Sequence, residues 1–187
     1  MQDISLHLLD IIQNSISANS TLINISINAD KFNNTLKIII ADNGRGMSEE
    51  LLNQVRSPFI TTRKSRRFGL GIPLFEDSTV FSGGSLTINS QLNLGTIVEA
   101  IYKIDHIDRI PLGDIGNTIT LLLSSEDNVE ISLKLICNEK VFEFDTFKIK
   151  RDFNDISFKN IEVINWIQGY INEGSKMVFG GVLNEIN

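Results

Sequence analysis

The sequence predicts an α+β domain in which helices cover one face of a mixed β-sheet. Three observations indicate this class: a helical period in the first eighteen residues, two pairs of strand-like segments after it, and helical segments between those pairs. The chain has 187 residues, of which 42% are hydrophobic and 21% are charged. This composition is typical of a globular protein that buries a core.

Residues 3–18 are predicted to form the first helix, because apolar side chains recur in them at helical spacing. The other side of this helix carries a polar stripe made of Asp3, His7, Asp10, Asn14 and Ser17. Taken alone, such a stripe is explained better by a solvated surface than by a functional face. Residues 22–29 then alternate in polarity as a strand does, and residues 36–42 read as a second, more fully buried strand.

A short helix, a loop and a longer helix are predicted next. The short helix starts at Ser48, which is followed by two acidic residues. Residues 55–68 hold a proline and five of the seventeen basic residues, show no clean period, and are expected to form a mobile loop. From Gly69 the pattern is helical as far as Gly83 and Gly84. Strands are predicted at 85–90 and 96–102.

The character of the chain changes after Lys103, so we predict one domain over residues 1–103 and a small α+β extension over 104–187. Residues 105–116 read as a connector. Strands are predicted at 117–125, 129–137 and 140–149, followed by an amphipathic helix at 158–174. This β-rich extension contains no motif that we can assign to chemistry.

Composition excludes several classes of function. The net charge is −6 and the isoelectric point is near 4.9, which argues against a dedicated nucleic-acid binder. The single cysteine, Cys137, has no partner for an internal disulfide, and we expect it to be a buried small hydrophobe. Charged residues interrupt the first apolar run, so we predict neither a signal peptide nor a membrane span. We expect a cytoplasmic protein.

The segment Asp42-Asn43-Gly44-Arg45-Gly46-Met47 follows the buried second strand directly. A carboxylate at that point can accept a hydrogen bond from an exocyclic amine. Glycines two residues apart allow a flat ring to approach the backbone. An ordinary turn after a strand is the alternative interpretation.

A second segment, Phe68-Gly69-Leu70-Gly71-Ile72, lies where the loop passes into a helix. Glycines at a helix start expose backbone N–H groups to phosphate oxygens. The basic residues just upstream, Arg63, Lys64, Arg66 and Arg67, complement phosphate charge or belong to a solvated loop.

The third feature is Asp10 and Asn14, one helical turn apart on the polar stripe. Together a carboxylate and an amide oxygen can hold Mg²⁺ and order a water.

In their order and spacing these segments resemble the superfamily of gyrase, heat-shock chaperone, histidine kinase and mismatch-repair ATPases, which share the Bergerat fold. The resemblance covers about residues 1–103. The four matching boxes are LLDIIQNSISA (8–18), DNGRGM (42–47), FGLGI (68–72) and Gly95-Thr96. In addition, SPFITTRK (57–64) resembles the entrance of the ATP lid in histidine kinases.

The resemblance implies that the protein binds ATP with Mg²⁺. Asn14 would ligate the metal, and Asp42 would accept from the adenine amino group, with Thr96 helping through water. Gly44 and Gly46 would make room for the base, and Met47 would pack near it.

The glycine box and the lid would hold the phosphates. Gly69, Leu70 and Gly71 would offer backbone N–H groups, and the lid residues near the phosphates would be Thr61, Thr62, Arg63 and Lys64. Asp10 stands where hydrolysing members usually have the glutamate that orients the attacking water. Aspartate is one methylene shorter than glutamate, so its carboxylate can fall short of the attacking water. This departure puts ATP hydrolysis in question.

Two functions are consistent with these features. The first is a protein kinase or slow ATPase in regulation, with Asp10 as the catalytic residue. The second is a non-hydrolysing, ATP-responsive module that docks a partner protein or a second copy of itself through the extension, around Trp166 and Tyr170. A DNA-dependent ATPase is disfavoured by the acidic composition. We do not expect His7 to be a phosphoacceptor, because no dimerisation hairpin precedes it; we expect a residue of the polar face or one that supports the site.

Overall fold

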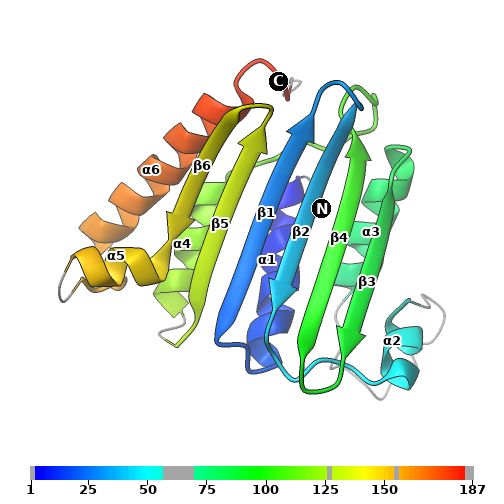
Figure 1. Cartoon of the computed structure of the whole chain (residues 1–187), viewed down its shortest axis with the longest axis horizontal. Coiled ribbons are helices and arrows are strands. Elements are labelled where there is room, and N and C mark those ends of the chain that lie inside the picture. Colours follow the sequence, from blue (N-terminus) through cyan, green and yellow to red (C-terminus); the bar gives the residue numbers. More distant parts are fainter. Residues whose placement is uncertain (1–2, 57–69, 126–127, 154–155, 184–187) are drawn as a thin grey trace.

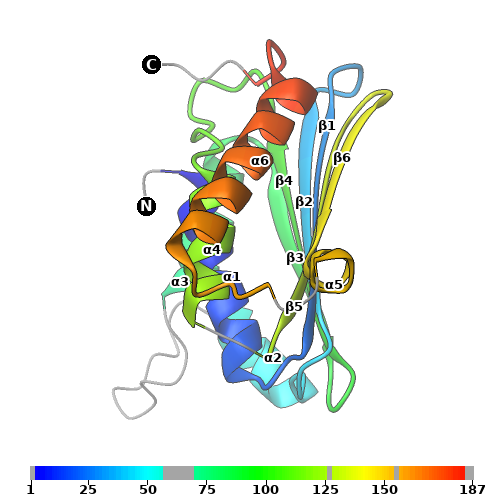
Figure 2. The ribbon, with the colours of Figure 1, turned by 90° about the vertical axis from the view of Figure 1, so that its left-hand side faces the viewer.

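The computed structural model describes residues 3–56, 70–125, 128–153 and 156–183, and within them one six-stranded sheet carries helices on one face (Figures 1 and 2). The strands are β1 (Leu22–Asp30), β2 (Thr35–Asp42), β3 (Ser85–Gln91), β4 (Gly95–Lys103), β5 (Glu130–Cys137) and β6 (Lys140–Asp145). The helices are α1 (Ile4–Ser17), α2 (Glu49–Arg56), α3 (Gly71–Phe81), α4 (Ile115–Ser125), α5 (Thr146–Asp152) and α6 (Ile161–Phe179).

The strand order across the sheet is β3-β4-β2-β1-β5-β6. β2 runs antiparallel to β1 and β4, and β3–β4 and β5–β6 are also antiparallel. β5 pairs with β1 in parallel, in a register that places Ile25 beside Leu133. The predicted class, an α+β fold with a mixed sheet, is therefore confirmed.

The helices α1, α3, α4 and α6 lie on the same face of the sheet (Figure 2). Alternate residues of β1, such as Ile23 and Ile25, point into this layer and are almost fully buried. α1 faces them with Ile4, Leu8 and Ile12, so its apolar side is the one that the period predicted.

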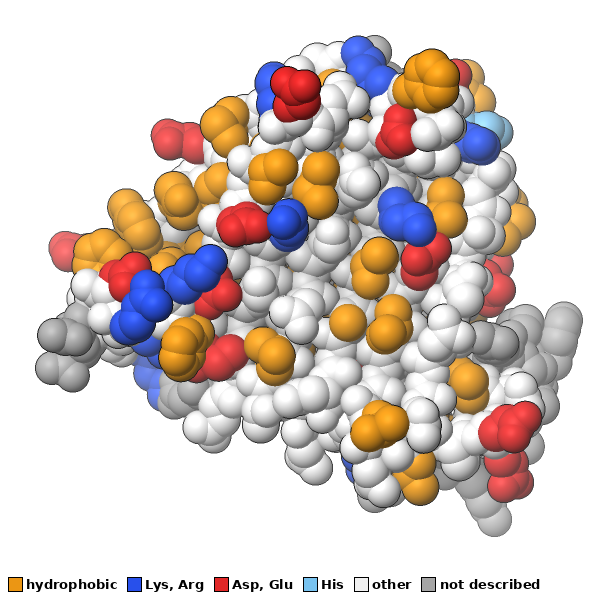
Figure 3. Space-filling view, in the orientation of Figure 1, with side chains coloured by type: hydrophobic (Ala, Val, Ile, Leu, Met, Phe, Trp, Pro, Cys, Tyr) orange, Lys and Arg blue, Asp and Glu red, His pale blue; other side chains and the backbone are white. Residues whose placement is uncertain are grey.

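The opposite face of the sheet shows a mixture of polar, charged and scattered apolar side chains (Figure 3). Ile97 and Val141 are each 46% exposed, and the Lys37 Nζ lies 3.1 Å from the Glu99 carboxylate. Singly scattered apolar side chains are normal on a protein surface. We therefore expect the candidate site residues to lie on the helix side of the sheet.

The helices and strands predicted for residues 1–103 are confirmed, with ends that agree to within a few residues. The loop predicted at 55–68 lies outside the described residues except for residues 55 and 56, which end α2. The prediction of a strand at 117–125 is wrong, because these residues form most of α4. Residues 146–149 were predicted to continue a strand but begin α5, because the Asp145 carboxylate accepts from the Lys148 N–H and caps a helix there. The remaining predicted strands correspond to β5 and β6.

The part of the chain after residue 103 contributes two strands to the same sheet, and its helix α4 contacts α1. The buried side chains of both parts form one hydrophobic cluster. Cys137 is 2% exposed within it, as expected. The division at residue 103 stays a prediction.

Candidate functional site

A row of three polar side chains crosses β2, β4 and β3 at one end of the sheet, on the helix side. Asp42 pairs with Thr96, and Thr96 pairs with Ser90. The neighbouring row on the same face is apolar, with Ile40 beside Val98. The polar row therefore lies at the edge of the hydrophobic core, where one side remains accessible.

Asp42 is the best anchored of these side chains. Its Oδ2 accepts from the Ser15 hydroxyl at 2.7 Å, and its Oδ1 accepts from the Ser20 hydroxyl at 3.2 Å and from the Gly44 N–H at 2.8 Å. An ionised carboxylate offers about four acceptor positions. Three donors thus fix the orientation of the half-buried carboxylate and leave acceptor capacity on Oδ2.

Ser90 joins the rest of the row to the segment after β2. Its Oγ accepts from the Met47 N–H at 2.8 Å and lies 2.9 Å from the Thr96 Oγ1. It also donates to the Gly95 carbonyl at 3.0 Å. Met47 and Thr96, two residues of the predicted pocket, are thereby held together by a third residue.

Two glycines allow the segment after β2 to pack directly on the start of β4. Gly46 has a φ of +61°, and a Cβ atom there would lie 2.0 Å from the Gln91 carbonyl oxygen. Gly95 has a φ of +112°, and its Cβ would lie 1.9 Å from the Asp42 carbonyl oxygen. Only glycine fits these positions. Their described contacts are with protein backbone; the predicted role of Gly44 and Gly46 in admitting a base stays a prediction.

α1 brings Asp10 and Asn14 to the same side, one turn apart. Asn14 is exposed and Asp10 is half-buried. Asp10 faces the first residue of α3: a Cβ atom added to Gly71 would lie 3.0 Å from the Asp10 Oδ2. Burial raises the pKa of the Asp10 carboxyl above its ordinary value.

His7 does not lie on a solvated face. It is 1% exposed, and its ring stacks on that of Phe75 from α3, with the centroids 5.0 Å apart. Desolvation lowers the pKa of His7 to about 4, so the ring is neutral at pH 7. Its Nδ1 has no hydrogen-bond partner among the residues described. The polar stripe of α1 thus faces α3 at this point.

The predicted phosphate-binding residues are only partly within the described structure. Thr61, Thr62, Arg63, Lys64 and Gly69 lie outside the described residues. Leu70 precedes α3 and is 66% exposed, whereas Gly71 is the buried first residue of that helix. The backbone at the start of α3 lies next to Asp10. A phosphate-binding site formed by α1 and α3 together requires this proximity.

A metal at this site would not be held by a cage of protein ligands. Among the described residues no group of three or more histidine, cysteine, aspartate or glutamate side chains could hold a metal ion. Mg²⁺ bound to a nucleotide needs only one or two protein oxygens beside phosphates and water. The exposed side-chain amide of Asn14 fits that smaller requirement.

A family model identifies the domain in which these residues lie. The model described as histidine kinase-, DNA gyrase B- and HSP90-like ATPase matches residues 2–106, which is more than half of the chain. The chain belongs to this family. It therefore has an ATP-binding domain of the GHKL type, and the four boxes in the sequence lie within the matched residues.

Similar proteins in this family include sensor kinases. Tetrathionate sensor histidine kinase TtrS of Salmonella typhimurium is 34% identical over 84 residues, which are 45% of this chain and 14% of that protein. Sporulation kinase D of Bacillus subtilis is 38% identical over 61 residues, or 33% of this chain and 12% of that protein. The chain thus spans only a small part of the length of these relatives.

Solved structures with a similar fold include a domain of a DNA repair protein and a MutL ATPase domain. The N-terminal domain of a DNA repair protein aligns with a TM-score of 0.51 at 13% identity, covering 97% of this chain and 58% of that one. The Aquifex aeolicus MutL ATPase domain complexed with ADP aligns with a TM-score of 0.50 at 10% identity, covering 90% and 69%. At these identities the likeness concerns the fold alone. Within the described ranges, no helix has the length and apolarity to cross a bilayer.

Three serines of the site were missed by the sequence analysis: Ser15, Ser20 and Ser90. Ser15 and Ser20 reach Asp42 from the end of α1 and the turn after it. The signal for Ser90 was the alternation of β3, which places it on the same face as the buried Ile88. The distance between these segments in the sequence concealed their contacts.

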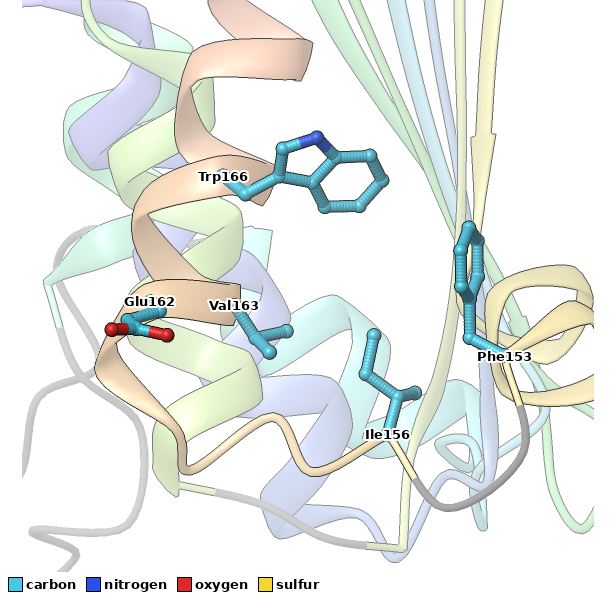
Figure 4. Close-up of a pocket in the computed structure, with 5 residues that line it drawn as sticks. All are labelled: Phe153, Ile156, Glu162, Val163 and Trp166. Atoms are coloured by element: carbon cyan, nitrogen blue, oxygen red, sulfur yellow. The ribbon is translucent and has the colours of Figure 1, made fainter.

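A second feature lies at the other edge of the sheet, between α5 and α6 (Figure 4). Phe153, Ile156, Val163 and Trp166 line an apolar hollow of about 230 Å³, with Glu162 at its side. Trp166 stacks on Tyr170 with the ring centroids 5.5 Å apart. The two rings are 48% and 42% exposed, respectively.

Proposed function

We propose that this protein binds ATP between α1 and α3, with the adenine base at Asp42 and the phosphates at the start of α3. The observation that carries the proposal is the Asp42 carboxylate, fixed by three donors and left with an acceptor position beside Thr96. A donor such as the adenine amino group would complete its hydrogen bonds.

We further propose that the bound ATP is turned over, as a protein kinase or a slow ATPase acting on a partner protein. Asp10 is adjacent to the start of α3, where the γ-phosphate would lie, and its raised pKa suits a group that accepts a proton. Because the start of α3 lies directly against the Asp10 carboxylate, the shorter side chain of aspartate has a smaller distance to span. Mg²⁺ held by Asn14 would neutralise the charge of the phosphates. We also place the protein in the cytoplasm, where ATP and Mg²⁺ are both available.

The proposal is tested with the full chain, MgATP labelled on the γ-phosphate, and calorimetry. We expect binding in the micromolar range and release or transfer of labelled phosphate that Asp10→Asn abolishes while binding persists. The absence of any heat of association with ATP and ADP would overturn the binding site itself.

A second function, an ATP-responsive docking module, is favoured by the exposed aromatic surface of Phe153, Trp166 and Tyr170. Aromatic side chains of this kind are enriched where proteins meet. Tight binding of ATP without turnover, in the presence and absence of partner proteins, would favour this function over the enzyme.

A further inference from the structure

Ser90 is one of the three serines of the site to which the resemblance assigns no role, and its hydroxyl contacts three groups there. The Met47 N–H approaches its Oγ at 2.8 Å, the Gly95 carbonyl oxygen lies at 3.0 Å and the Thr96 Oγ1 at 2.9 Å. Each contact is within hydrogen-bond distance. The hydroxyl is therefore engaged on all sides.

The chemistry of the partners decides which way each hydrogen bond runs. A backbone N–H can only donate and a carbonyl oxygen can only accept, whereas a hydroxyl has one proton and two lone pairs. Ser90 accepts from Met47 and donates its single proton to Gly95. Either hydroxyl of the Ser90–Thr96 pair can donate; when Ser90 gives its proton to Gly95, its remaining lone pair accepts from Thr96.

We propose that Ser90 is a positioning residue that orients the Thr96 hydroxyl as a hydrogen-bond acceptor toward the nucleotide, and that Ser90 thereby strengthens the preference for a 6-amino over a 6-oxo purine that the resemblance implies at Asp42. This inference rests on the proposed binding of the base at Asp42.

The selection follows from the neighbours of Thr96. Its cross-strand partner Asp42 is a carboxylate, which only accepts when ionised. With the proton of Thr96 committed to Ser90, both side chains present lone pairs to the edge of the base. An amino group at position 6 meets them with two protons, whereas a 6-oxo purine places lone pairs at that position and has a single proton on the neighbouring N1.

The test compares the dissociation constants of ATP and inosine triphosphate, which carries oxygen at position 6, by calorimetry on the full chain. We expect the wild-type protein to prefer ATP. In Ser90→Ala the Thr96 proton is free to turn toward the oxo group, so the ratio of the two constants should fall by about fivefold to tenfold. Ser90→Thr keeps the hydroxyl and should keep the wild-type ratio. Ser85→Ala, at the exposed far end of β3, is the matched control.

A second background separates this role from general damage to the fold. Thr96→Val removes the hydroxyl through which Ser90 acts, so adding Ser90→Ala to it should leave the ratio unchanged. An unaltered ratio in a folded Ser90→Ala protein, or an equal effect of Ser90→Ala in the Thr96→Val background, would overturn the inference. If the wild-type protein bound neither nucleotide, the proposed function itself would fail.

Discussion

The carboxylate of Asp10 lies against the backbone of Gly71, so closely that a Cβ atom on Gly71 would come to 3.0 Å from Asp10 Oδ2 and Cβ. One residue belongs to the polar stripe of α1 and the other to the glycine box at the start of α3. Glycine at position 71 is thus what allows the two helices to meet at the proposed catalytic side chain.

Replacing Gly71 by alanine should therefore displace Asp10. We expect phosphate release to fall roughly tenfold to hundredfold, because small misplacements of a catalytic group are costly. The measurement is steady-state release of labelled phosphate at saturating MgATP. Gly169→Ala is the control, since a Cβ on Gly169 of α6 meets no atom within 4 Å. Equal turnover in the two variants would contradict the prediction.

Replacing Asp42 by alanine should remove nucleotide binding and weaken the fold together. The Ser15 and Ser20 hydroxyls and the Gly44 N–H lose their acceptor, and we expect the free energy of unfolding to drop by about 1–3 kcal/mol. Calorimetry with ATP and urea denaturation measure the two effects. Asp30→Ala, a change to a carboxylate that accepts from Asn33 at the opposite end of β1 and β2, should retain ATP binding. Retained ATP affinity in Asp42→Ala would refute the assignment of the base site.

His7 should make the stability of the protein depend on pH in a defined window. Its pKa is about 4 in the folded protein against 6.5 in the unfolded chain, so between these values the unfolded chain binds more protons. The free energy of unfolding should be highest above pH 6.5 and fall as the pH drops toward 4, by up to about 3 kcal/mol. Urea denaturation at a series of pH values measures this dependence.

The control for this dependence of the free energy of unfolding on pH is His7→Phe, which keeps a ring to stack on Phe75 and has no group that titrates. It should flatten the change in stability between pH 4 and 6.5. An unchanged slope in this variant would show that other groups cause the dependence.

Replacing Trp166 by alanine should lower stability without affecting ATP binding, because the aromatic surface and the nucleotide site are independent. Trp166 packs on Tyr170 and Phe153, so we expect a loss of about 1 kcal/mol in the free energy of unfolding. The ATP dissociation constant should stay within about twofold of the wild-type value, which corresponds to under 1 kcal/mol. A larger change in ATP affinity would indicate that the two regions are coupled.

The amino-terminal half of the fold could be predicted because its patterns are unambiguous. α1 has one apolar side, and β1 and β2 alternate between buried and accessible residues. α4 could not, because it packs between α1 and α6 and buries residues around most of its circumference. A short, largely apolar segment of this kind can also be read as a buried strand, and its threonines and isoleucines favour a strand.

The site was predictable at the residues that form local motifs and not at those that act across the sheet. Asp42 and its glycines stand in one short segment, and so does the pair of Asp10 and Asn14. Ser90 contributes through a strand pairing that the sequence leaves unspecified. The burial of His7 could not be predicted, because a polar residue on a polar stripe is ordinarily solvated, whereas α3 covers this one.

The parallel pairing of β5 with β1 affects how the protein folds. It joins Leu22 to Glu130, more than a hundred residues further along the chain. Closing so long a loop is entropically costly, and contacts of this kind slow folding. Until β5 arrives, one edge of β1 has unpaired N–H and C=O groups, so a nascent or truncated chain exposes a strand edge that is prone to aggregation.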